Sequence, residues 1–149
     1  MPKDYELHIY GDGEYREFVI EHTKKNRNIN YYGFKDRETV AEDQSNSVAT
    51  IVSSECYETF GMAIPECFSM GIPVLATDVG NPGQMVKESG GGRTFISQDI
   101  NSLKEAIDEV ILNREKYASA AFEYYKLYLN AENNYKRLMD IYVKARHFG

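Results

Sequence analysis

Two glutamates, Glu58 and Glu66, stand eight positions apart in the segment "ECYETFGMAIPE", with Gly61 between them. An ionised carboxylate only accepts hydrogen bonds, so it suits sugar and ribose hydroxyls better than phosphate. The residues after Gly61 have a helical pattern, and the first N–H groups of a helix are unpaired and partly positive. These features predict a site for a ligand that joins an anionic group to hydroxyl-bearing rings.

A second interpretation of the same segment needs no ligand. Glu58 would then be a negative charge near a helix N-terminus, and Glu66 would lie on a solvated face. Pro65 bears on both interpretations because proline is tolerated only in the first turn of a helix. It predicts that the helix begins at residues 61–63.

Short apolar runs alternate with helical patterns along most of the chain, which is typical of a parallel sheet covered by helices. We expect strands at residues 5–11, 29–34, 48–54, 72–77 and 92–97. We expect helices at residues 14–25, 37–46, 61–71, 83–89 and 100–113, the last with Asn101 as its N-cap. The pattern predicts an α/β, Rossmann-like parallel sheet over residues 1–113. A helical tail at 114–149 would pack on the same domain.

The composition excludes several classes of protein. With 42% apolar and 27% charged residues the chain is globular rather than disordered. A net charge of −6 argues against a nucleic-acid partner, which would need a clustered basic surface. Cys56 and Cys67 match no metal-ligand spacing, and we expect both to be free thiols in a reducing cytoplasm.

The first predicted strand ends in "YGDGEY", which resembles the beginning of a dinucleotide-binding fingerprint. Gly11 and Gly13 fit the first two glycines, but Arg16 occupies the third glycine position. We therefore favour a tight strand-to-helix turn. A receiver-like or NAD-binding domain is a poorer interpretation, because no paired acids end this strand either.

The segment from Ser53 to Val86 resembles the donor-binding segment of retaining GT-B glycosyltransferases, of family 4 in particular. Glu58 and Glu66 match the family's E-x7-E motif, and residues 71–74 match its G-x-P-V. The likeness continues in order and spacing over residues 5–113. It departs where the family reads G-G-x-x-E, since Asn81 and Gln84 replace the second glycine and the glutamate.

The resemblance implies a role for particular residues. Glu58 would be the catalytic-site carboxylate that holds hydroxyls of the transferred sugar, and Glu66 would bind the nucleotide ribose. The remaining donor-binding positions would be Phe60, Gly61 and Met62 beside the diphosphate or sugar, and Phe34 and Lys35 near the base. It implies no metal and no cofactor, because a helix dipole and basic side chains can take up the charge of the leaving diphosphate.

For the whole enzyme, the resemblance implies transfer of a hexose from a UDP-, GDP- or ADP-sugar to an acceptor glycan or lipid. Such an enzyme would serve polysaccharide biosynthesis in the cytoplasm, with peripheral membrane association through its full length. The alternative is a noncatalytic fragment or interaction module that docks a separate acceptor domain.

The family's acceptor-binding domain has no counterpart in this sequence, and neither does the strand and helix that open its donor domain. The missing strand would be central in a doubly wound sheet. Its loss would separate the strand at residues 5–11 from the strand at 48–54. We therefore expect an N-terminal acceptor-binding domain or a partner strand, unless these two strands pair directly.

Overall fold

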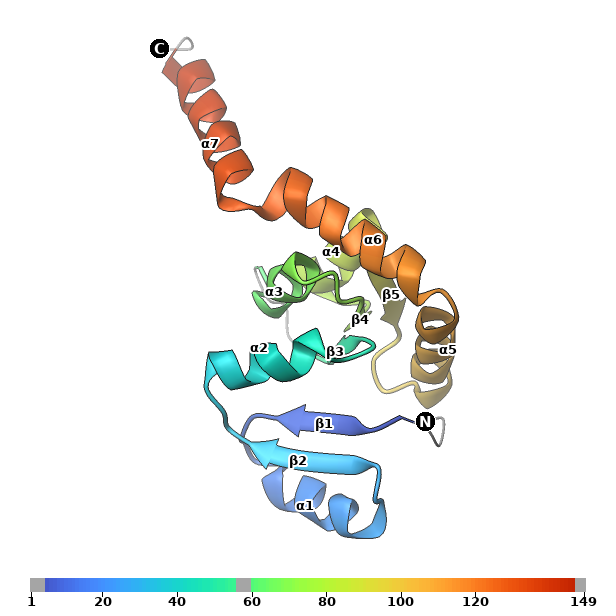
Figure 1. The fold of residues 1–149 in the computed structure, drawn as a ribbon. Coiled ribbons are helices and arrows are strands. Elements are labelled where there is room, and N and C mark those ends of the chain that lie inside the picture. The colour runs from blue at the N-terminus through green and yellow to red at the C-terminus, as the bar shows by residue number, and fades with distance from the viewer. Residues whose placement is uncertain (1–4, 56–59, 147–149) are drawn as a thin grey trace. The chain divides into compact units, whose positions relative to one another are not determined.

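The computed structural model describes residues 5–55 and 60–146, in which strands and helices alternate as the sequence predicts (Figure 1). The elements are β1 (Leu7–Tyr10), α1 (Arg16–Lys25), β2 (Ile29–Gly33), α2 (Arg37–Ser45), β3 (Thr50–Val52), α3 (Ala63–Ser69), β4 (Val74–Thr77), α4 (Gly80–Ser89), β5 (Gly92–Phe95), α5 (Ile100–Leu112), α6 (Arg114–Tyr124), η1 (Tyr125–Leu129) and α7 (Ala131–Arg146). Contacts divide the chain into two compact units, Met1–Asp43 and Gln44–Gly149.

The first unit contains the parallel pair β1–β2, with Leu7 opposite Ile29 and Ile9 opposite Tyr31. Side chains alternate between the faces of a strand, so Leu7 and Ile9 share one face of β1. His8 lies on the other face, where its ring Nδ1 is 2.8 Å from a carboxylate oxygen of Asp43 on α2. The two faces of this small sheet therefore differ in polarity.

The second unit is built on the parallel sheet β3–β4–β5, whose central strand β4 is buried along its whole length. Val74 packs on one side of β4 with Phe68 of α3 and Val86 of α4. Leu75 packs on the other side with Val110 of α5. Burial on both faces explains why β4 reads as a continuous apolar run rather than an alternating one.

The predicted α/β fold with parallel strands is confirmed, but the described strands form two sheets rather than one. Within the described residues, β1 pairs only with β2 and β3 only with β4. Whether the strands at 5–11 and 48–54 pair directly stays an open expectation.

The N-cap of α5 and the start of α4 differ from the sequence-based expectation. The side chain of Asp99, not Asn101, caps α5 by accepting hydrogen bonds from the amides of Asn101 and Ser102 at 2.9 and 3.0 Å. Helix α4 begins at Gly80 rather than at residue 83. Pro82 is compatible with this earlier start because it lies in the first turn, where a missing N–H breaks no helical bond.

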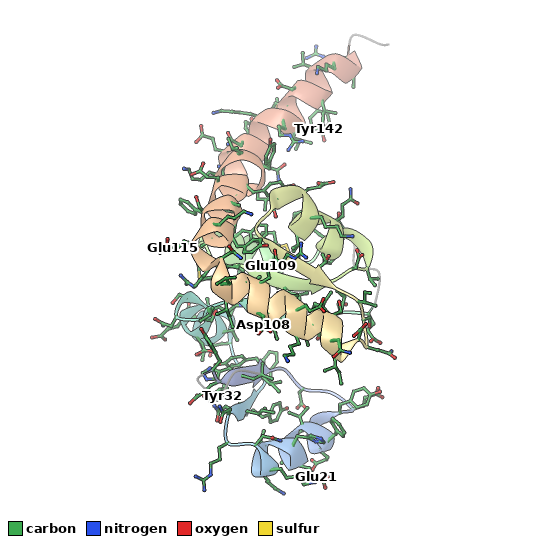
Figure 2. The ribbon with its side chains drawn as sticks, turned by 90° about the vertical axis from the view of Figure 1, so that its right-hand side faces the viewer. Glu21, Tyr32, Asp108, Glu109, Glu115 and Tyr142 are labelled. Carbon is green, nitrogen blue, oxygen red and sulfur yellow. The ribbon has the colours of Figure 1, made fainter. Side chains whose placement is uncertain are left out.

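The C-terminal helices form the tail that the sequence predicts. Tyr117 and Ala121 of α6 are buried, and the hydroxyl of Tyr117 donates to the carboxylate of Glu109 on α5, labelled in Figure 2. By contrast, α7 buries none of its residues, and Tyr142 is 58% exposed (Figure 2). The boundary at residue 113 between domain and tail stays a prediction.

In the part of the chain that the structure describes, none of the helices has the length and apolarity to cross a membrane.

Candidate functional site

The carboxyl ends of β3, β4 and β5 meet at one edge of the second unit's sheet, because the three strands are parallel. In open α/β sheets, ligands bind in the crevice outside this edge. The hydroxyl of Thr77, at the end of β4, donates a hydrogen bond to the backbone carbonyl of Ser54, two residues after β3. This partly buried bond ties the polypeptide that leaves β3 to the central strand.

A second set of contacts joins the loop after β3 to the loop after β5. The carboxylate of Glu55 accepts hydrogen bonds from the Ser97 hydroxyl and, at 3.2 Å, from the Gln98 side-chain amide. These two donors lower the pKa of Glu55 because they stabilise its ionised form. Gln98 has a φ of 61°, a left-handed conformation that is uncommon for a residue other than glycine.

Asp78, the residue directly after β4, belongs to an ion pair. The ammonium group of Lys87 on α4 contacts the carboxylate of Asp78, and both side chains are about half exposed. Exposed pairs of this kind contribute little to stability. The pair instead places one basic and one acidic group beside the carboxyl edge of the sheet.

The segment before α3 has the local structure that the sequence predicts. Helix α3 begins at Ala63, within the expected range, and Pro65 is its third residue. Gly61 is buried with a φ of 65°, which a residue with a Cβ rarely adopts, and its carbonyl accepts the Ile64 amide at 3.0 Å. The flanking side chains of Phe60 and Met62 are 46% and 59% exposed, so they are accessible to a ligand.

The predicted site residues that the structure describes fall in two places. Glu66 lies in the first turn of α3 and is partly exposed, close in sequence to Phe60, Gly61 and Met62. Glu58 lies outside the described residues. Phe34 and Lys35 follow β2 in the first unit and are exposed. The roles assigned to all these residues stay predictions.

The sequence-based reasoning missed the side chains that join the strand ends, namely Thr77, Glu55, Ser97 and Gln98. Their positions directly after predicted parallel strands were the available signal, since such positions share one edge of the sheet. That signal identifies the edge of the sheet at which these side chains lie. It does not identify which of them hydrogen-bond to one another, because hydrogen bonds between loops depend on the loop conformations.

Residues 1–126 match the family model described as "Glycosyl transferases group 1". The chain therefore belongs to this family, and the resemblance to GT-B glycosyltransferases is confirmed.

Two curated relatives agree with this family. An uncharacterized glycosyltransferase of Methanocaldococcus jannaschii is 29% identical over 148 residues, which are 92% of this chain and 42% of that protein. The lipopolysaccharide 1,6-galactosyltransferase of Salmonella typhimurium is 24% identical over 119 residues, 76% of this chain and 33% of that protein. The chain thus spans less than half of the length of either relative.

Two solved structures share the fold. Sucrose-phosphate synthase from Thermosynechococcus elongatus has a TM-score of 0.76 at 22% identity, over 97% of this chain and 39% of that one. Anabaena HepE in complex with UDP has a TM-score of 0.78 at 18% identity, over 96% of this chain and 42% of that one.

Proposed function

We propose that this chain is the donor-binding part of a cytoplasmic glycosyltransferase that transfers a hexose from a nucleoside diphosphate to an acceptor glycan or lipid, with retention of configuration. The observation that carries the proposal is the family match over residues 1–126 together with an E-x7-E motif. In the sequence, that motif begins between β3 and α3 and ends in the first turn of α3. The UDP in the HepE structure and the galactosyltransferase activity of the Salmonella relative support the choice of ligand.

The proposed binding mode assigns each part of the donor to a part of this segment. The backbone of Phe60, Gly61 and Met62 lies beside the diphosphate or sugar, and the amides at the start of α3 favour negative charge. The Glu66 carboxylate accepts hydrogen bonds from the ribose hydroxyls. Glu58 accepts hydrogen bonds from hydroxyls of the transferred sugar, so it orients the sugar for transfer.

Calorimetric titration of the 149-residue chain with UDP, GDP and ADP tests nucleotide binding. We expect one of the three to bind, and Glu66→Ala to weaken it by about 10- to 100-fold, the value of a hydrogen bond to a charged group. Glu105→Ala is the matched control, because Glu105 is an exposed acid on α5. The proposal is wrong if no nucleotide gives heat, or if the control loses as much affinity as Glu66→Ala.

A separate titration tests the role of Glu58. If Glu58 holds the sugar, Glu58→Ala weakens the binding of a nucleotide sugar but leaves the affinity for the free nucleotide unchanged. Equal losses for both ligands would remove Glu58 from the sugar site.

The second function to consider is a noncatalytic module that docks a separate acceptor domain. It is favoured by the tail, since α7 exposes the apolar side chains of Leu138, Ile141 and Tyr142. Absence of nucleotide binding, combined with loss of partner binding in Ile141→Asp, would support this function over the first.

A further inference from the structure

Glu55 follows β3 at the carboxyl edge of the β3–β4–β5 sheet. Its carboxylate accepts hydrogen bonds from the Ser97 hydroxyl at 2.5 Å and from the Gln98 side-chain amide at 3.2 Å, and both donors lie in the loop after β5. Because β4 lies between β3 and β5 in the strand order, these bonds join the loops of two strands that are not neighbours. We call these two hydrogen bonds the loop bridge.

The turn that carries the two donors contains an unusual residue. The amide of Asp99 donates to the carbonyl of Ile96 at 3.1 Å, so residues 96–99 form a four-residue turn with Gln98 in its third position. Gln98 has a φ of 61°, and glycine is the residue favoured at this position when φ is positive. Glutamine costs backbone free energy there, but it supplies the side-chain amide that reaches Glu55. Residues held in such conformations cluster at functional sites.

Stability alone does not account for the loop bridge. Both of its hydrogen bonds are exposed to solvent, where water competes for the donors and for the carboxylate. Exposed hydrogen bonds therefore add little to the free energy of folding. The two donors lower the pKa of Glu55, so its carboxylate is ionised at neutral pH and both hydrogen bonds are charge-assisted. We expect such a contact to fix the positions of the loops rather than to stabilise the sheet.

The loop bridge lies at the start of the chain segment that leads to Phe60, Gly61 and Met62, which we call the donor segment. The far end of this segment is anchored as well, because Gly61 is buried and its carbonyl accepts the Ile64 amide at 3.0 Å. A chain that is held at both ends samples fewer conformations. It therefore loses less conformational entropy when it binds a ligand.

We propose that Glu55 is a positioning residue, which holds the donor segment in the conformation that binds a nucleoside diphosphate. This assignment rests on the proposed function, because it concerns the same segment. Glu55 acts through Ser97 and Gln98 and needs no contact with the ligand. An ionised carboxylate would also repel a diphosphate, which argues against direct contact between the two.

Amide chemical shifts of the ¹⁵N-labelled 149-residue chain test the positioning without a ligand. Ser97→Ala removes one donor of the loop bridge at a residue far from the donor segment in sequence, and Glu55→Ala removes the acceptor. We expect both variants to shift the donor-segment amides and to speed hydrogen exchange of the Ile64 amide by about threefold or more. Glu105→Ala, which removes an exposed acid of α5, is expected to change neither.

Calorimetric titration with UDP, GDP and ADP measures the effect on affinity. Glu55→Ala, Ser97→Ala and Gln98→Gly are each expected to weaken the nucleotide that binds by about 3- to 10-fold, the value of one hydrogen bond. Gln98→Gly removes the side-chain amide but keeps the backbone conformation, since glycine adopts a positive φ without strain. Glu55→Gln is expected to retain most of the affinity, because its amide oxygen can still accept from Ser97. Unchanged amide shifts in the β3–β4–β5 core would show that each variant is folded.

Three outcomes overturn the proposal. Unchanged donor-segment amides in both Glu55→Ala and Ser97→Ala would show that the loop bridge does not position the segment, whether or not a nucleotide binds. A loss of affinity in Glu55→Ala alone, with Ser97→Ala and Gln98→Gly unaffected, would show that the carboxylate contacts the ligand itself. An equal loss in Glu105→Ala would assign the effect to net charge. Absence of nucleotide binding by the unaltered chain would instead refute the proposed function, and the amide shifts would still decide whether Glu55 positions the segment.

Discussion

The hydroxyl of Thr77 donates a hydrogen bond to the carbonyl of Ser54, and so joins the carboxyl ends of two neighbouring parallel strands. Thr77 is 2% exposed, and its neighbours along β4 are apolar core residues. The bond is partly buried, and an acceptor that loses its donor in such a position costs stability. The bond therefore holds the start of the β3–α3 connection, in which Phe60, Gly61 and Met62 lie.

We predict that Thr77→Val, which keeps the side-chain shape but removes the hydroxyl, lowers the free energy of unfolding by about 1–3 kcal/mol. Urea denaturation measures this loss. Thr77→Ser is the rescue variant, because it keeps the hydroxyl and loses only a methyl group. A loss in Thr77→Ser as large as that in Thr77→Val would show that packing, and not the hydrogen bond, stabilises this position.

The close approach of α4 to the end of β4 gives a second prediction. A Cβ added at Gly83 would lie 2.6 Å from the carbonyl oxygen of Thr77 and 3.2 Å from the Cα of Asp78. Both are backbone atoms, so the helix must shift, and we expect Gly83→Ala to lower the free energy of unfolding by about 1–3 kcal/mol.

Gly13→Ala is the matched control for Gly83→Ala, since nothing lies within 4 Å of a Cβ added at Gly13. Thermal or urea unfolding of the two variants in parallel makes the comparison. If Gly83→Ala unfolds at the same denaturant concentration as Gly13→Ala, then α4 does not approach the end of β4 as closely as the structure indicates.

The strand positions were predictable from the sequence because each buried strand is a short apolar run between turn residues. "IPVLAT" became β4, whose side chains are buried on both faces, and the helix before it began where Pro65 required. Helix periodicity also identified the tail. It could not show which parts are covered: Tyr117 is buried by α5, whereas Tyr142 on α7 is exposed. Periodicity tells which residues share a helix face, but not what packs against that face.

Helix caps and loop contacts were less predictable. Asp99 and Asn101 are both good N-cap residues two positions apart, and the choice depends on the backbone of the loop after β5. The same loop conformation brings Ser97 and Gln98 to Glu55. The sequence did indicate the α3 segment of the candidate site, since E-x7-E is a local pattern. The contacts between loops have no local pattern of this kind.

The observed cap gives a third prediction. Asp99→Ala removes the acceptor of two backbone amides at the start of α5, so we expect the free energy of unfolding to fall by about 1 kcal/mol. Asn101→Ala changes an exposed residue whose side chain is not the cap, and it should have a much smaller effect. Denaturation curves that rank the two variants in the opposite order would restore Asn101 as the cap.

The fourth prediction concerns pH and the first unit. The hydrogen bond to the Asp43 carboxylate is the largest cause that raises the pKa of His8 above 6.5, and burial opposes it. The groups facing the ring are Asp43 from α2, Glu6 just before β1, and Tyr32, whose ring meets it edge-on. Because the pKa is higher in the folded protein than in the unfolded chain, protonated His8 stabilises the fold fully below about pH 6.5.

That stabilisation is lost as the pH rises through the folded-state pKa of His8. NMR titration of the His8 ring should therefore give a pKa above 6.5 in the native protein, and Asp43→Asn should lower it, because the variant removes the negative partner. Asp12→Asn removes an acid whose carboxylate instead accepts the amide of Gly13, and it should leave the His8 titration unchanged. A His8 pKa at or below 6.5 in the native protein, or one insensitive to Asp43→Asn, would mean that the ring and this carboxylate are not paired in solution.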